Sequence, residues 1–126
     1  MQIPAAIVVP VRKESIKVAR DWVGTVLEES GRDAYVAKVV VSELVTNVLR
    51  HTSSTTTTVR VVESDQGTVL EVFDSSDTLP LTGTTDLLSE DGRGLAMMTA
   101  LVKDWGAQPL GNGGKAIWAL LPKEAP

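Results

Sequence analysis

Hydrophobic positions in the first half of the chain follow the period of a strand and then that of two helices. Residues 3–11 are rich in Ile and Val, which favours an extended strand. Apolar residues of segment 14–30 recur at steps of three and four, so they share one face of a helix that Gly31 can end. A second apolar period predicts another helix, which Asp33 can cap and which runs to about His51.

The second half of the chain reads as strands separated by turns, with one further helix. The predicted strands share β-prone residues and are segments 58–63, 68–74, 104–110 and 115–121. A Ser-Asp-Gln-Gly turn joins the first two of them into a hairpin. Residues 75–91 are polar and aperiodic, and a loop of that length in a compact domain usually acts as a lid or a binding loop. A helix from Leu95 to about Lys103 is expected after it.

These elements define a fold class. Their order is β-α-α-β-β-α-β-β, which favours a mostly antiparallel sheet covered by helices on one face. We therefore expect an α+β two-layer sandwich, formed by residues 1–126 as a single domain. Trp22 and Trp118 fall within apolar patterns and are expected in the core.

Composition and charge limit the classes of function that the chain can have. The chain has 126 residues, 43% of them hydrophobic, which is globular rather than disordered composition. Its formal net charge is −4, which argues against nucleic-acid binding because that needs a basic surface. Cysteine is absent, and no apolar run is long enough to span a membrane. We expect a soluble, cytoplasmic protein that binds neither nucleic acid nor membrane.

Polar residues interrupt the apolar face of the second predicted helix. Glu43, Asn47 and His51 are spaced four apart, so they share the face that carries Val36 and Val40. A carboxylate and an amide on an inward face can position a magnesium ion and a nucleophile, whereas an exposed polar stripe is the structural alternative. His51 is the only histidine, which argues against a catalytic triad and a His-rich metal centre.

Two further features can carry chemistry. Asp74 follows an apolar strand, where its carboxylate can accept a hydrogen bond from a ligand amino group or can start a turn. Gly92, Arg93 and Gly94 precede a helix, where backbone N–H groups attract anions and Arg93 can pair with a phosphate. The alternative is an ordinary loop that enters a helix, since no Walker or Rossmann motif is present.

Taken in order, these segments resemble a known superfamily. Residues 43–51, ELVTNVLRH, look like the N box of the GHKL ATPases, which include gyrase, histidine kinases and mismatch-repair ATPases. The sequence VFD at 72–74 looks like the start of the G1 box, and GRGL at 92–95 looks like the G2 box. The closing segments WG and GGKAIW are also similar. The resemblance covers about residues 5–121 and is strongest to the anti-sigma factor serine kinases of actinobacteria.

The resemblance implies the Bergerat fold, with ATP between the sheet and the helices. Under it, Asp74 would accept the adenine amino group and Asn47 would hold Mg²⁺ through its side-chain oxygen. Glu43 would be the general base that takes the proton from a substrate serine, a contribution of ~10²–10⁴-fold in rate.

The phosphate side of the site follows from the same resemblance. Arg50 would lie near the phosphates, and the glycine-flanked Arg93 segment would cradle the phosphate chain. Lys115, in the closing hairpin, is a further ligand candidate. Phosphoryl transfer depends mostly on positioning and charge neutralisation, which suits such a set of groups.

The implied function is that of an ATP-dependent protein serine kinase that sequesters a sigma factor and phosphorylates an anti-anti-sigma antagonist. The resemblance also implies a homodimer, for which strand 3–11 and helix 14–30 are candidate surfaces. One departure keeps an alternative open. The G1 box usually reads Asp-x-Gly-x-Gly, but Ser76 and Thr78 stand at the glycine positions here. A regulatory module of the same fold that binds partners without phosphoryl transfer is the second hypothesis.

Overall fold

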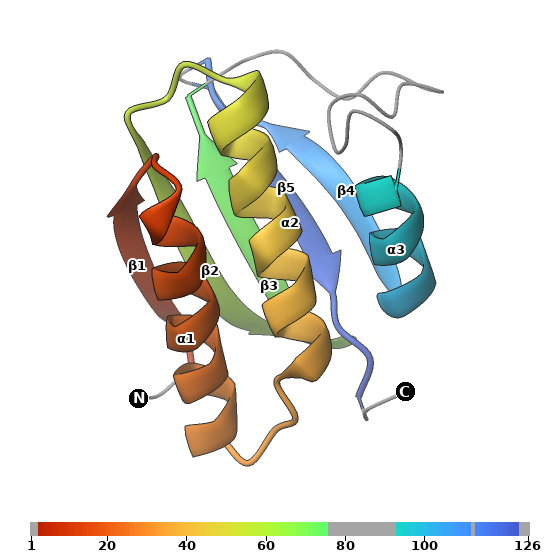
Figure 1. Ribbon diagram of the computed structural model, residues 1–126. Helices are drawn as coiled ribbons and strands as arrows, with labels where there is room; N and C mark the ends of the chain where they lie inside the picture. The colour runs from red at the N-terminus through yellow and green to blue at the C-terminus, as the bar shows by residue number, and fades with distance from the viewer. Residues whose placement is uncertain (1–2, 76–92, 112, 124–126) are drawn as a thin grey trace.

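The computed structural model describes residues 3–75, 93–111 and 113–123 (Figure 1). Its elements follow the predicted order. They are β1 (Ala5–Pro10), α1 (Glu14–Glu29), α2 (Tyr35–His51), β2 (Thr56–Ser64), β3 (Gly67–Asp74), α3 (Arg93–Leu101), β4 (Asp104–Pro109) and β5 (Lys115–Leu120). The predicted long loop and Gly92 lie outside the described residues, apart from Ser75.

The five strands form one sheet in the order β1-β2-β3-β5-β4, and every pairing is antiparallel. The three helices all lie on one face of this sheet (Figure 1). The predicted α+β two-layer sandwich is therefore confirmed. None of the helices that the structure describes is long and apolar enough to cross a membrane.

The connection between α1 and α2 is set by two residues. Gly31 has φ +76°, a left-handed conformation that glycine adopts without steric cost and that commonly ends helices. The Asp33 carboxylate accepts a 2.9 Å hydrogen bond from the backbone N–H of Tyr35. It thus satisfies one of the N–H groups that the first helical turn leaves without a partner. Asp33 stabilises the helix start as predicted, although the N-cap position itself is Ala34.

The core lies between the sheet and the helices. Burial alternates strictly along β3, whose helix-facing residues are buried while the others are half-buried. Val59 and Val61 of β2 and Leu70 and Val72 of β3 are almost completely inaccessible to solvent. Each such side chain contributes roughly 1.5–3 kcal/mol by leaving water. These rungs fix the register that places the end of β3 under α2.

Trp118 is not a core residue, which corrects the sequence prediction. It pairs with Glu71 and Gly106 in the sheet and is half-buried, on the face that the helices do not cover. A Cβ on Gly106 would come within 2.8 Å of the indole ring, so the glycine leaves the space that the ring occupies. Trp22 and Trp105, by contrast, are partly buried against the core.

Candidate functional site

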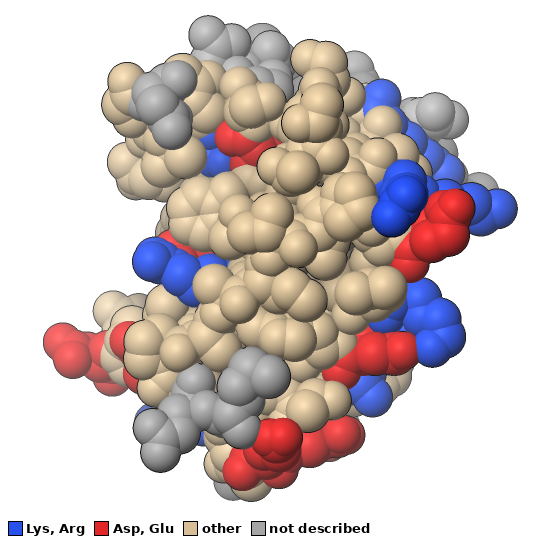
Figure 2. Space-filling view, turned by 90° about the vertical axis from the view of Figure 1, so that its left-hand side faces the viewer, with Lys and Arg blue, Asp and Glu red and all other residues tan. Residues whose placement is uncertain are grey.

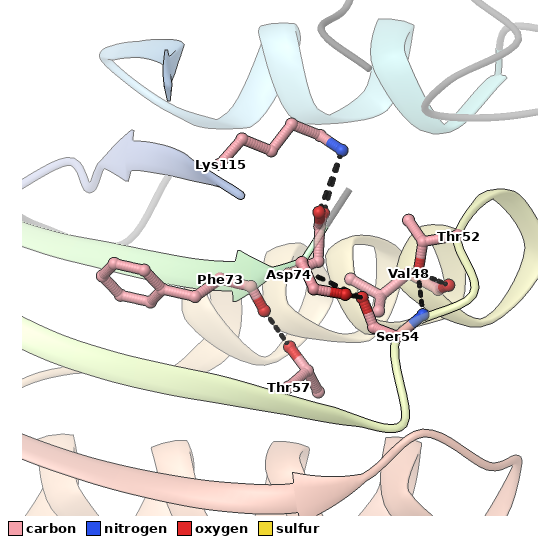
Figure 3. Close-up of polar contacts among 8 residues, drawn as sticks. Val48, Thr52, Ser54, Thr57, Phe73, Asp74 and Lys115 are labelled. Atoms are coloured by element: carbon pink, nitrogen blue, oxygen red, sulfur yellow. Dashed lines mark hydrogen bonds and ion pairs between the residues drawn. The ribbon is translucent and has the colours of Figure 1, made fainter. Parts of the chain in front are cut away.

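Asp74 and Lys115 form a buried ion pair at one end of the sheet. Asp74 is the last residue of β3 and Lys115 the first residue of β5, and the two are register partners. The Lys115 ammonium lies 3.1 Å from Oδ1 and 3.0 Å from Oδ2 of Asp74. The two side chains are only 7% and 3% exposed. Figure 3 shows the Lys115 ammonium next to the Asp74 carboxylate. Asp74 continues the alternation of buried, helix-facing residues along β3.

Hydroxyl groups connect this strand end to the C-terminus of α2 (Figure 3). The Thr52 hydroxyl donates to the Val48 carbonyl oxygen at 2.8 Å and accepts the Ser54 N–H at 3.2 Å. The Ser54 hydroxyl oxygen lies 2.9 Å from that of Ser75 and also accepts the Ser75 N–H. The residue after Asp74 is therefore hydrogen-bonded to the chain that leaves α2.

A hydroxyl group of β2 holds the residue that precedes Asp74. Thr57 of β2 is 2% exposed and donates a 2.6 Å hydrogen bond to the carbonyl oxygen of Phe73. The residues on both sides of Asp74 are thus held by buried hydroxyl groups. A carboxylate positioned in this way loses little conformational freedom when it binds a ligand.

The polar residues of α2 lie partly inside the protein, as the sequence predicts. Asn47 is 7% exposed, whereas Glu43 and His51 are half-buried. Within the described part of the chain, the buried Nδ2 of Asn47 and Nε2 of His51 have no hydrogen-bond partner. Such groups are rare in folded proteins because each costs free energy, so an unpaired buried amide is a candidate ligand contact.

The structure describes fewer contacts for the remaining predicted site residues. Arg50 is exposed at the end of α2. Arg93 and Gly94 form the start of α3, so the glycine-rich segment does open a helix, and Gly92 lies outside the described residues. Among the described residues no group of three His, Asp or Glu side chains could hold a metal ion by itself.

Sequence reasoning missed three of these residues, namely Ser54, Thr57 and Ser75. Ser54 and Thr57 come from the Ser/Thr-rich stretch that follows α2, and Ser75 directly follows Asp74. The available signal was the Ser/Thr composition, because such hydroxyls readily bond to nearby backbone groups.

Two hollows of the described surface bear on the site. One, of about 420 Å³, lies at the same end of the sheet and touches Asp74, but it opens on the face that the helices do not cover, where Thr58 and Phe73 line it. The other, of about 230 Å³, lies at the opposite end of β2 and β3, where Arg32 and Glu63 form a 2.7 Å ion pair. The second hollow includes none of the predicted site residues.

A family model described as the histidine kinase-like ATPase domain matches residues 9–120. The chain belongs to this family. No curated protein matches the chain significantly. Membership of the histidine kinase-like ATPase family supports the GHKL assignment and implies ATP binding, typically with Mg²⁺. The match includes α2, the end of β3 and the start of α3, which carry the three sequence boxes.

Proposed function

We propose that the protein is an ATP-dependent regulatory serine kinase of the anti-sigma type. It would sequester a sigma factor and phosphorylate an anti-anti-sigma antagonist. The observation that carries the proposal is the buried carboxylate of Asp74, held at the strand end next to the chain that leaves α2, within a histidine kinase-like ATPase fold. Asp74 would accept the amino group of adenine.

The residues present fit a magnesium nucleotide. Mg²⁺ in nucleotide sites usually keeps several waters and needs only one or two protein oxygens besides the phosphates. Asn47 supplies one buried amide whose nitrogen has no partner among the described residues, which is consistent with a side chain oriented for a ligand. When bound, Mg²⁺ would neutralise phosphate charge, which matters in a chain of net charge −4.

Glu43 would act as the general base. It lies one turn before Asn47 on α2, is half-buried, and makes no ion pair with a described residue. Its carboxylate would take the proton from a substrate serine hydroxyl as the serine oxygen bonds to the γ-phosphorus. The bond from that phosphorus to the bridging oxygen breaks and ADP leaves, so charge and atoms balance.

The second candidate is a non-catalytic module of the same fold. It is favoured by Ser76 and Thr78, which replace the two glycines of the usual G1 box. Such a module would bind a sigma factor or another partner, with or without nucleotide, and transfer no phosphate.

We further propose a cytoplasmic homodimer that pairs through the β1 edge. β1 ends the sheet and contains no charged residue, and Val8 is 61% exposed. Figure 2 views this side, where uncharged surface fills the centre and many of the charged side chains lie along the right-hand margin. An uncharged edge strand can pair with its own copy about a two-fold axis, because both strands expose unpaired backbone groups.

The deciding experiment incubates the pure protein with labelled ATP, Mg²⁺ and an anti-anti-sigma antagonist from the source cell. Phosphoserine on the antagonist that disappears in Glu43→Gln supports the kinase. Tight partner binding without phosphoserine supports the non-catalytic module instead.

A further inference from the structure

The Asp74–Lys115 pair differs in charge from the neighbouring residue pairs of β3 and β5. On the helix-facing side of β3 and β5, the next two rungs are Val72 with Ile117 and Leu70 with Ala119. All four of those residues are buried and apolar. Only the rung at the end of the pair, where the proposed adenine contact lies, carries charges on this side.

Stability alone does not explain a charged rung at that place. Removing two charges from water is costly, and a buried ion pair is often no more stabilising than apolar residues of similar volume. An apolar pair would simply continue the two rungs before it. The charges are therefore better explained by a ligand that uses them.

We propose that Lys115 is a specificity-determining residue that reads the adenine base together with Asp74. The pair places a hydrogen-bond acceptor and a donor side by side in a buried site. Adenine offers the complement, because its amino group is a donor and the adjoining ring nitrogen is an acceptor. Asp74 would accept from the amino group while Lys115 donates to that ring nitrogen. This inference rests on the proposed ATP function.

The pair can bind the base without separating. An ammonium group has three N–H donors, and its two contacts with Asp74 use at most two of them. A base with a carbonyl oxygen in place of the amino group, such as hypoxanthine, would face Asp74 with a second acceptor if it were held in the same position, so this contact would be lost.

The test measures nucleotide dissociation constants by calorimetry for ATP, 1-deaza-ATP, 7-deaza-ATP and ITP, all with Mg²⁺. The two deaza analogues each lack one of the ring nitrogens that adjoin the amino group. The wild-type protein should bind one deaza analogue about tenfold more weakly than ATP, as expected for the loss of a charged hydrogen bond. ITP should bind more weakly than ATP as well.

Two variants test whether Lys115 is the residue that distinguishes ATP from the deaza analogue. Lys115→Met should bind ATP about tenfold more weakly and should no longer distinguish ATP from the discriminated deaza analogue. Lys115→Arg keeps a cation beside Asp74, so it can be measured even if the methionine variant does not fold. Because the planar guanidinium places its donors differently, the arginine variant should fold yet lose the same discrimination. Lys17→Met, which breaks an exposed ion pair with Asp21, is the matched control and should behave as wild type.

Equal binding of ATP and both deaza analogues by the wild-type protein would overturn the role of Lys115. So would discrimination that persists in both Lys115 variants, since a purely structural lysine would leave it unchanged. If ATP binds and depends on Asp74, such results overturn only the role of Lys115. If no nucleotide binds to the wild-type protein, the proposed function fails as well.

Discussion

The hydroxyl of Ser54 lies 2.9 Å from that of Ser75 and accepts the Ser75 backbone N–H. This contact joins the chain leaving α2 to the residue that follows Asp74. Two parts of the proposed site, the α2 helix and the end of β3, are therefore linked by a side chain that is only 7% exposed.

Ser54→Ala should weaken both folding and nucleotide binding. The substitution removes the part-buried hydrogen bond that the Ser75 N–H donates, which costs about 0.5–1.5 kcal/mol in the free energy of unfolding. ATP affinity should fall several-fold because Asp74 is held less firmly. Urea unfolding and calorimetry measure the two effects. Ser53→Ala, at the exposed neighbouring position, is the control, and equal behaviour of the two variants would contradict this role for Ser54.

Asn47→Leu should separate stability from function. The variant removes a buried amide whose nitrogen has no partner among the described residues and replaces it with an apolar side chain of similar size. Stability without ligand should be unchanged or higher by about 1 kcal/mol, while Mg²⁺-dependent ATP binding should be lost. Thermal unfolding with and without ATP and Mg²⁺ checks both effects. A large loss of stability with normal ATP binding would assign Asn47 a structural role instead.

Glu43→Gln should abolish phosphoryl transfer while ATP binding is retained. The amide cannot take the serine proton, so the transfer rate should fall by ~10²–10⁴-fold. Single-turnover assays give the rate, and calorimetry gives the affinity. Glu28→Gln on the exposed side of α1 is the matched control. A Glu43 variant that is as active as wild type would exclude Glu43 as the general base.

Val8→Glu should reduce the protein to a monomer. The exposed position tolerates the change within one chain, but a two-fold pairing of β1 edges would bring two carboxylates close together. Gel filtration with light scattering measures the mass. Tyr35→Glu, which is also at a highly exposed position but lies at the start of α2, should leave the mass unchanged. A dimer that withstands the Val8 substitution would place the interface elsewhere.

The elements of this fold could be predicted because periodicity and turn residues are local signals. The apolar steps of α1, the Gly31 stop and the hairpin turn before Gly67 all act within a few residues. The prediction that Trp118 lies in the core is wrong because the segment from Ala116 to Leu121 is apolar throughout and shows no alternation. Only the pairing with Glu71 and Gly106 reveals which side Trp118 occupies.

The sequence predicts which residues belong to the site, but it does not predict which of them are in contact. Asp74 and Lys115 are 41 positions apart, and their pairing depends on the register between β3 and β5. A shift of one residue would turn one side chain to the opposite face, and no local pattern fixes that choice. The link between Ser54 and Ser75 spans 21 positions and has the same origin.

The proposed kinase activity and the proposed role of Lys115 both depend on recognition of the adenine base of ATP by Asp74. Titration calorimetry of ATP with Mg²⁺ into wild-type protein and into Asp74→Asn tests it most directly, with circular dichroism to verify that the variant is folded. The amide replaces a charged acceptor, so affinity should fall about 10- to 100-fold, the equivalent of a charge-assisted hydrogen bond. A folded Asp74→Asn variant that binds ATP as tightly as the wild-type protein would contradict the account.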